Sequence, residues 1–101
     1  MMPAIAVLLA TASIMASPRP PQLGLCASCH TESGCSRIDG TPHLAAQDET
    51  YLRQALAAYR SGGRDHAAMR ALAGALSVRD IAALASWYAT LPACPAPEVS
   101  S

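Results

Sequence analysis

The chain of 101 residues is long enough for one small domain, and 51% of it is apolar while only 14% is charged. This balance excludes a disordered acidic or basic tail. Seven basic residues, all of them arginine, oppose seven acidic ones, so the formal net charge is zero. The sequence therefore carries no electrostatic signature of a nucleic-acid-binding protein or of attachment to an anionic membrane surface.

An apolar segment at positions 4–16 is interrupted only by Thr11 and Ser13. A membrane-spanning helix needs roughly 20 apolar residues, and prolines at 18, 20 and 21 end this segment sooner. We therefore expect residues 1–16 to be a secretory signal peptide that is cleaved after Ala16, leaving one domain at 17–101 outside the cytoplasm. An uncleaved anchor is the alternative, because no basic side chain precedes the apolar segment.

The exported part contains no strand pattern of alternating β-branched residues, so helices are expected. Residues 22–30 can form one or two helical turns, and a loop rich in Gly, Ser and Thr follows at 31–42. A helix over 49–60 begins at the N-cap Asp48 and ends at Gly62. Its apolar face consists of Leu52, Ala55, Leu56 and Tyr59.

Two further helices are predicted after this one. A short helix over 67–75 is weakened by Gly74. A longer one over 78–90 starts at Ser77, with Asp80 completing a capping box, and ends at Pro92. Its apolar positions are Ile81, Leu84, Ala85, Tyr88 and Leu91.

The motif that points to chemistry is Cys26-Ala27-Ser28-Cys29-His30. On a helical turn the two thiols face the same side, so both can bond the two vinyl groups of one haem while His30 becomes an axial iron ligand. A buried haem would also supply apolar surface to a chain with one Trp, three Tyr and no Phe. The alternative is a zinc or disulfide domain that uses Cys26, Cys29, Cys35 and His43.

Met69, His66 and His43 are the candidates for the second axial ligand. Met69 follows the helix 49–60 and its glycine turn, so it is far enough along the chain to reach the opposite face of a haem. Ordinary core packing is the alternative for a single Met. His66 is the nearest competitor, whereas His43 lies on the His30 side and is expected to be an exposed loop imidazole.

The sequence resembles a class I cytochrome c of the small bacterial exported type, whose domain also occurs duplicated in dihaem cytochromes. The resemblance covers about residues 24–91. It rests on strings that occur in the family's order: Cys26 to His30, Pro42-His43-Leu44-Ala45-Ala46-Gln47, Tyr51-Leu52 with Gln54-Ala55-Leu56, Tyr59-Arg60-Ser61-Gly62-Gly63-Arg64, Met69, and Leu76-Ser77 with Asp80-Ile81 and Trp87-Tyr88.

The resemblance implies an all-α class I cytochrome c fold with three to four helices around one covalently bound haem c. It implies His30 as the proximal ligand, Met69 as the distal ligand, and a hydrogen bond from His30 to the carbonyl of Pro42. Arg64 matches a position near the distal ligand loop, although a solvated surface arginine is the alternative. Trp87 or Tyr88 would contact the first helix.

The chain departs from the family pattern in three ways. The segment before Cys26 is short and rich in proline, so the first helix should be unusually short. Thr31 stands where the family often has Gly. Cys35 and Cys94 are additional, and in an oxidising compartment they are candidates for a disulfide, with free thiols or a link to another subunit as alternatives.

With both axial positions filled, the iron has no open site for a substrate. The predicted function is therefore a periplasmic electron carrier rather than an enzyme, docking transiently with redox partner proteins. A cytochrome subunit of a larger dehydrogenase or oxidase is the main alternative, for instance with a flavoprotein that oxidises sulfur compounds. A haem-based sensor, in which a gas displaces Met69, is a third.

Overall fold

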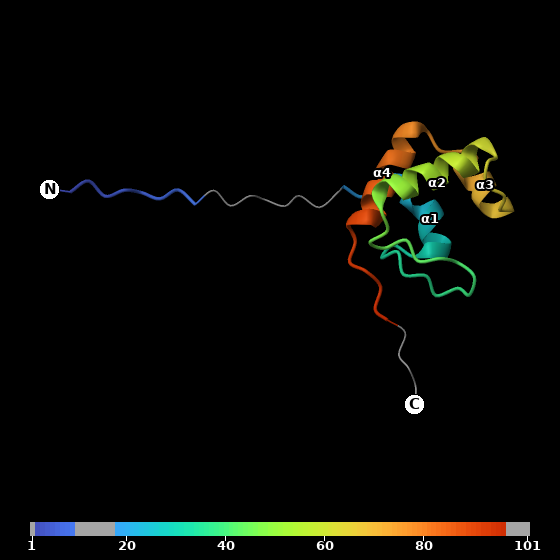
Figure 1. Ribbon diagram of the computed structural model, residues 1–101, viewed down its shortest axis with the longest axis horizontal. Helices are drawn as coiled ribbons and strands as arrows, with labels where there is room; N and C mark the ends of the chain where they lie inside the picture. Colours follow the sequence, from blue (N-terminus) through green and yellow to red (C-terminus); the bar gives the residue numbers. More distant parts are fainter. Residues whose placement is uncertain (1, 10–17, 97–101) are drawn as a thin grey trace, which may run out of the picture.

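The computed structural model describes residues 2–9 and 18–96 and contains four α-helices within them. These are α1 (Leu23–His30), α2 (Glu49–Ser61), α3 (Ala67–Gly74) and α4 (Val78–Thr90), and the described residues contain no strand (Figure 1). The all-α prediction is confirmed, and each helix lies within one residue of an expected range.

The ends of the longer helices follow from local side-chain chemistry. Asp48 accepts the Tyr51 amide at 2.8 Å at the start of α2, and Gly62 ends that helix in the left-handed conformation at φ 87°. At the start of α4, Ser77 Oγ accepts the Asp80 amide at 3.0 Å, and Asp80 returns a bond to the Ser77 amide at 2.9 Å. The predicted capping box is confirmed.

The core lies where α2 packs against α3 and α4. Leu23 brings α1 into this core and is fully buried. The predicted apolar face of α4 is confirmed, since four of its five positions are buried and Leu91 packs against them. The buried core consists of Leu23, Leu52, Leu76, Ile81, Leu84, Ala85 and Tyr88.

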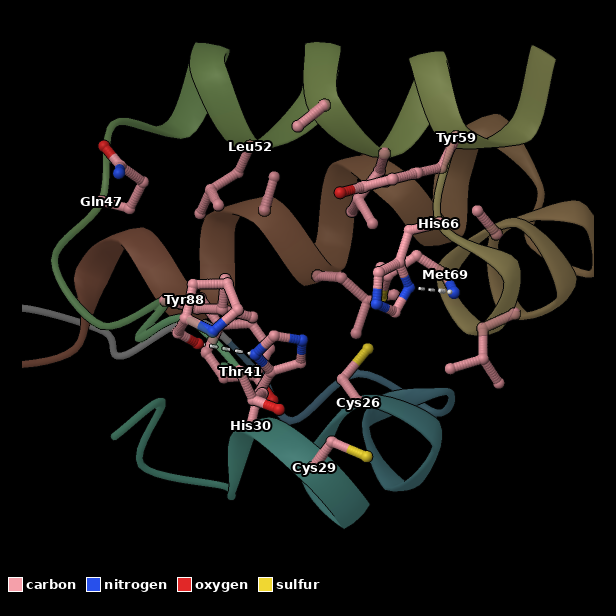
Figure 2. A pocket seen from close by; sticks show the side chains of 18 of the residues that line it. Cys26, Cys29, His30, Thr41, Gln47, Leu52, Tyr59, His66, Met69 and Tyr88 are labelled. Carbon is pink, nitrogen blue, oxygen red and sulfur yellow. Dashed lines mark hydrogen bonds between the residues drawn. The ribbon is translucent and has the colours of Figure 1, made fainter. Parts of the chain in front are cut away.

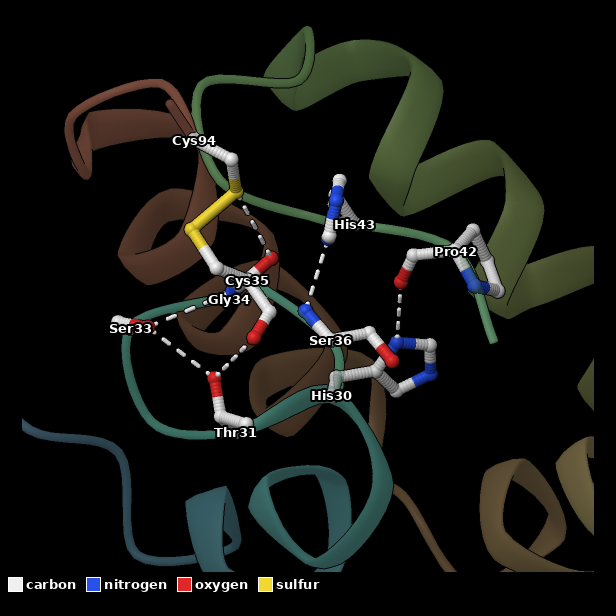
Figure 3. Close-up of a disulfide and its surroundings, with 9 residues drawn as sticks. All are labelled: His30, Thr31, Ser33, Gly34, Cys35, Ser36, Pro42, His43 and Cys94. Atoms are coloured by element: carbon white, nitrogen blue, oxygen red, sulfur yellow. Dashed lines mark hydrogen bonds between the residues drawn. A yellow bond between two sulfur atoms is a disulfide. The ribbon is translucent and has the colours of Figure 1, made fainter. Parts of the chain in front are cut away.

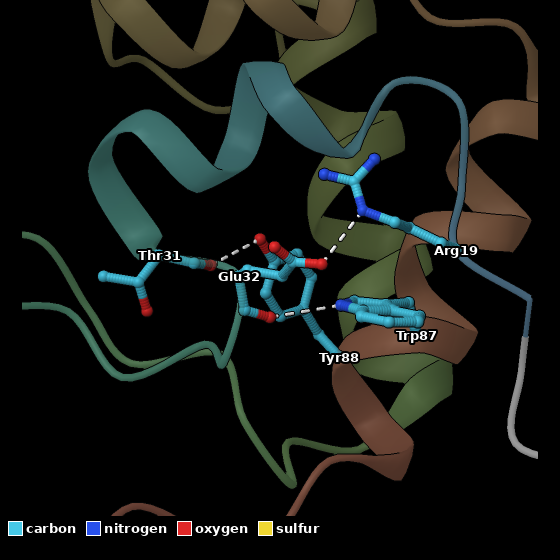
Figure 4. Close-up of polar contacts among 5 residues, drawn as sticks. All are labelled: Arg19, Thr31, Glu32, Trp87 and Tyr88. Carbon is cyan, nitrogen blue, oxygen red and sulfur yellow. Dashed lines mark hydrogen bonds and ion pairs between the residues drawn. The ribbon is translucent and has the colours of Figure 1, made fainter.

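The turn that follows α1 is attached to α4 by two long-range hydrogen bonds (Figure 4). Tyr88 Oη donates to the carbonyl of Thr31 at 2.9 Å, and Trp87 Nε1 donates to the carbonyl of Glu32 at 3.2 Å. Glu32 also forms an exposed ion pair with Arg19 at 2.9 Å. The two aromatic residues thus connect the first and last helices mainly through the turn.

Thr31 has a backbone conformation that normally requires glycine. Its φ of 63° and ψ of 165° belong to a region that costs a side-chain-bearing residue about 1–3 kcal/mol. The Tyr88 bond and a bond from Thr31 Oγ1 to the Cys35 carbonyl at 3.0 Å hold it there. The substitution of Thr for the family's Gly therefore preserves a glycine-type turn.

Residues 2–9 belong to no helix or strand, and their side chains are exposed. The predicted cleavage position after Ala16 lies outside the described residues. Within the part of the chain that is described, no helix combines the length and the hydropathy needed to span a membrane.

Candidate functional site

A cavity of about 340 Å³ lies among the four helices and the loop before α2 (Figure 2). In that view α2 lies above the cavity, α1 below it, and α3 to the right. The whole predicted apolar face of α2, from Leu52 to Tyr59, lines it. Further apolar lining comes from Leu44, Leu72, Ala73, Leu76, Leu84 and Ala85.

The cysteine motif forms the α1 wall of this cavity. Cys26 and Cys29 are both free thiols, half-buried and exposed respectively, and both line the cavity. Burial raises the pKa of Cys26 above its ordinary value because the thiolate would lose hydration. The two thiols therefore lie on one side of one helix, as the spacing predicts.

His30 is buried at the end of α1, with 7% of its surface exposed. Its Nδ1 lies 2.8 Å from the carbonyl oxygen of Pro42. Because a carbonyl can only accept, Nδ1 must carry the proton, and in the neutral imidazole Nε2 then keeps the free lone pair. An imidazole oriented in this way is prepared to bind a metal through Nε2.

Met69 reaches the same cavity from α3 and is half-buried. His66, its predicted competitor, also lines the cavity, but its Nδ1 accepts the Met69 amide at 3.3 Å and so caps α3. Figure 2 shows both side chains beside the cavity, on the side away from His30. The structure therefore gives His66 a capping contact that the sequence analysis did not anticipate.

The two remaining polar candidates also border the cavity. His43 is exposed as expected, yet its Nδ1 accepts the Ser36 amide at 2.8 Å. The Arg64 guanidinium lies over the Tyr59 ring, 4.6 Å from its centre. Arg64 is exposed, as a surface arginine would be, and is also stacked on a residue that lines the cavity.

Cys35 and Cys94 form a disulfide with a Cα–Cα distance of 5.6 Å. A cysteine in a disulfide has no thiolate to offer a metal, so Cys35 is not available as the zinc ligand that the alternative requires. Among the described residues, no three His, Cys, Asp or Glu side chains are grouped as a metal site would require. The zinc alternative has no support in this geometry.

The sequence analysis missed the contribution of α3 to the cavity apart from Met69. Leu72 and Ala73 of α3, and Leu76 just after its end, follow Met69 at helical spacing and line the cavity. This spacing indicates an apolar helix face, but it was not recognised because the predicted helix is short and contains Gly74 near its end. Thr41 also lines the cavity and has no pattern that would single it out, whereas Gln47 belongs to one of the strings that carry the family resemblance.

The groups around the cavity fit a covalently bound haem. The thiols of Cys26 and Cys29 lie on one wall, where both can bond to the vinyl groups of one haem. The His30 imidazole and the Met69 sulfur, which are candidate iron ligands, come from different helices. The rest of the lining is mainly apolar. This donor set matches the chemistry of an iron porphyrin.

The sequence matches no family model, but it is similar to several curated proteins. It is 36% identical over 72 residues to cytochrome c-554(548) of Halomonas halodenitrificans, covering 68% of this chain and 87% of that protein. It is 36% identical over 73 residues to the thiosulfate dehydrogenase electron acceptor of Thiomonas intermedia, covering 71% of this chain. The chain spans only 34% of the length of that second relative.

The fold has a solved counterpart. Reduced recombinant cytochrome c4 from Pseudomonas stutzeri superposes with a TM-score of 0.62 and 35% identity, over 66% of this chain and 38% of the other. The match to nearly the whole length of one cytochrome and the shared fold agree with the cavity and its donor set. The chain belongs to the class I c-type cytochromes, which are electron-transfer proteins with covalently bound haem c.

Proposed function

We propose that the protein is a periplasmic monohaem electron carrier in which Cys26 and Cys29 hold the haem while His30 and Met69 bind its iron. The observation that carries this proposal is that all four side chains line one cavity, with three on α1 and Met69 on α3. The chain contains a single Cys-x-x-Cys-His motif, which supports one haem. The apolar segment at 4–16 supports export.

Bound in this cavity, haem c would supply one-electron chemistry through its ferrous and ferric states. His30 and Met69 would both bind the iron and leave it no site for a substrate, which argues against a catalytic role. The carbonyl of Pro42 fixes the His30 imidazole, and the apolar lining excludes water. Methionine ligation and an apolar lining both favour a high reduction potential.

Partner docking would occur at the edge of the cavity. Leu25 and Tyr51 border it and are 37% and 49% exposed. With a formal net charge of zero, the chain offers little long-range steering. Contacts between such small apolar surfaces suit a short-lived complex, which an electron carrier needs.

The test is an optical spectrum of protein made with haem-attachment machinery, in both oxidation states and with carbon monoxide. A low-spin spectrum with the methionine-to-ferric charge-transfer band, unaffected by carbon monoxide, is expected. Met69→Ala should lose that band and bind carbon monoxide, while the matched variant His66→Ala should keep the band. A low-spin spectrum that lacks this band in the unmodified protein, and that becomes high-spin in His66→Ala but not in Met69→Ala, would identify His66 as the ligand.

Mass spectrometry of the same preparation gives the number of haems, and one is expected. Absence of covalent haem would refute the proposal. A high-spin spectrum that responds to carbon monoxide in the unmodified protein would instead favour the sensor alternative.

A second candidate is a redox subunit that receives electrons within a larger complex. The relatives named as electron acceptors of thiosulfate dehydrogenase favour it. Size measurement on native material separates the two candidates, because a carrier elutes alone and a subunit elutes with its dehydrogenase. Rapid reduction of the purified protein by a dehydrogenase of sulfur compounds would identify the donor class in either case.

A further inference from the structure

We propose that the Cys35–Cys94 disulfide and His43 are positioning groups that hold the carbonyl of Pro42 against His30 and thereby lower the reduction potential of the haem (Figure 3). The inference rests on His30 as an iron ligand in the proposed function. It assigns a role in electron transfer to a disulfide that lies outside the cavity.

Pro42 cannot fix its own carbonyl. Proline has no N–H to anchor it, and the residue is exposed. Its carbonyl oxygen nevertheless lies 2.8 Å from Nδ1 of the buried His30. The position of this oxygen must therefore depend on the neighbouring residues. Before Pro42, the Thr41 amide donates to the carbonyl of Ile38 at 3.1 Å, and after Pro42 the following residues make contacts of their own.

Those contacts go to the two residues on either side of Cys35. The carbonyl of Gly34 accepts the amides of Leu44 and Ala45 at 2.8 and 3.2 Å. The amide of Ser36 donates to His43 Nδ1 at 2.8 Å. The segment 42–45 is therefore held by the backbone that carries Cys35, and the next amide, that of Ala46, donates directly to α4, at the Tyr88 carbonyl and 3.0 Å.

The approach of Gly34 to this segment is close. Gly34 has a φ of 78°, and a Cβ at this position would lie 2.7 Å from the Ala45 amide nitrogen and 2.9 Å from Tyr88 Cδ1. A side chain would push the two segments apart. The pairing of the loop with segment 42–45 is thus specific to this backbone geometry.

The disulfide is the covalent anchor of this part of the loop. Tyr88 and Trp87 hold the first half through the carbonyls of Thr31 and Glu32. The second half, around Cys35, is bonded to Cys94 beyond the end of α4, at a sequence separation of 59. Without this bond, the residues around Cys35 would lose their cross-link to the chain beyond α4 and would keep only the backbone connections to α1 and α2 and their hydrogen bonds.

The electronic consequence has a definite sign. A hydrogen bond from Nδ1 makes the imidazole a better electron donor, which favours ferric iron and lowers the reduction potential. A longer or more mobile contact to Pro42 would raise the potential. Water entering a loosened cavity would act in the opposite direction, because a polar environment favours the more highly charged ferric haem.

The experiment compares holoproteins by spectroelectrochemistry and by NMR exchange of the His30 Nδ1 proton. The double variant Cys35→Ser/Cys94→Ser should have a higher potential and faster exchange than the unmodified protein. His43→Ala should shift both in the same direction, but less. In His43→Asn the potential and the exchange rate should return most of the way to those of the unmodified protein, because the Asn Oδ1 can accept the Ser36 amide.

Trp87→Phe is the matched control, since it removes a bond from α4 to the same loop at Glu32, whereas the bonds of the loop to segment 42–45 are made by Gly34 and Ser36. Its potential should stay unchanged. An equal shift in Trp87→Phe would overturn the proposal, because general loosening would then explain the effect.

An unchanged or lowered potential in the double variant, with its low-spin spectrum intact, would also overturn the inference while leaving the proposed function standing. If the unmodified holoprotein shows no low-spin spectrum, the proposed function itself is refuted. If the double variant fails to retain haem, the pair His43→Ala and His43→Asn decides, and equal potentials in that pair would refute the inference.

Discussion

The two walls that carry the candidate iron ligands are built on helices of equal length but are secured very differently. Both α1 and α3 have eight residues. On the α1 wall, His30 is buried and hydrogen bonded to Pro42, and Leu23 anchors the helix in the core. On the α3 wall, Met69 is half-buried, and Ala73 is the only buried residue of the helix.

The polar contacts show the same asymmetry. The turn after α1 is bonded to α4 and stapled by the disulfide. The start of α3 is held by the exposed cap His66 and by an exposed ion pair between Arg70 and Asp65 at 3.8 Å, which contributes little in water. Local opening should therefore begin on the Met69 side, and exchange of the iron ligand should occur there first.

The largest loss of stability is expected from removing the disulfide that secures the loop after α1. Cys35→Ser/Cys94→Ser should lower the free energy of unfolding of the holoprotein by about 4 kcal/mol, because a long loop in the unfolded chain is no longer closed. Denaturant titration measures the change. A loss below roughly 1 kcal/mol would show that the hydrogen bonds of the turn suffice without the staple.

The buried anchors of the two helices can be compared directly. Leu23→Ala should cost about 3 kcal/mol, because it leaves a cavity in the core. Ala73→Gly on α3 should cost about 1 kcal/mol through lost helix propensity. Val78→Ala, at a position 74% exposed, serves as the neutral control. Equal losses at Leu23 and Ala73 would contradict the proposed difference between the walls.

Tyr88→Phe tests the polar link between α4 and the turn. Loss of the bond to the Thr31 carbonyl should cost about 1.5 kcal/mol at neutral pH. Burial, followed by the nearby Cys26 and Glu32, raises the pKa of Tyr88 in the folded protein. Thermal unfolding of the variant and the unmodified protein measures the cost.

The same pair gives a pH dependence. The stabilising contribution of neutral Tyr88 is complete below the unfolded pKa of about 10 and is lost as the pH rises further, because the unfolded chain then releases a proton that the folded chain retains. The unmodified protein should therefore lose stability above about pH 10 more steeply than Tyr88→Phe. Parallel curves would exclude the buried hydroxyl as the cause.

The smallest effect concerns the cap of α3. His66→Ala should cost about 1 kcal/mol of local stability, while His66→Asn should retain the cap through its Oδ1. With ferric haem bound, added imidazole should displace Met69 faster in His66→Ala than in His66→Asn. Stopped-flow mixing measures both rates, and identical rates would show that the cap does not position Met69.

The sequence contained most of the fold because its signals are local. Asp48, Ser77 with Asp80, and Gly62 act within one helical turn, so their roles could be predicted from neighbouring residues alone. The apolar face of α2 could be predicted from spacing, and it lines the cavity in full. The short helix α3 had a weaker pattern, and its share of the cavity wall was missed.

The site divides in the same way. The spacing of Cys26, Cys29 and His30 puts three groups on one wall by helical geometry alone. His43 accepts a hydrogen bond from the Ser36 amide, and His66 accepts one from the Met69 amide. Each bond depends on how the folded backbone places that amide beside the imidazole. Neither histidine could be assigned a structural role from composition or spacing.

The sequence by itself determined the helices, their caps and the placement of Cys26, Cys29 and His30 on one wall, because each depends on interactions between residues a few positions apart. Only the tertiary structure decided that Cys35 lies beside Cys94, that Tyr88 reaches the carbonyl of Thr31, and that Thr31 takes a glycine-like conformation. These features depend on how α4 packs against the turn after α1. Contacts between residues more than fifty positions apart arise from packing of the whole core, which no local pattern encodes.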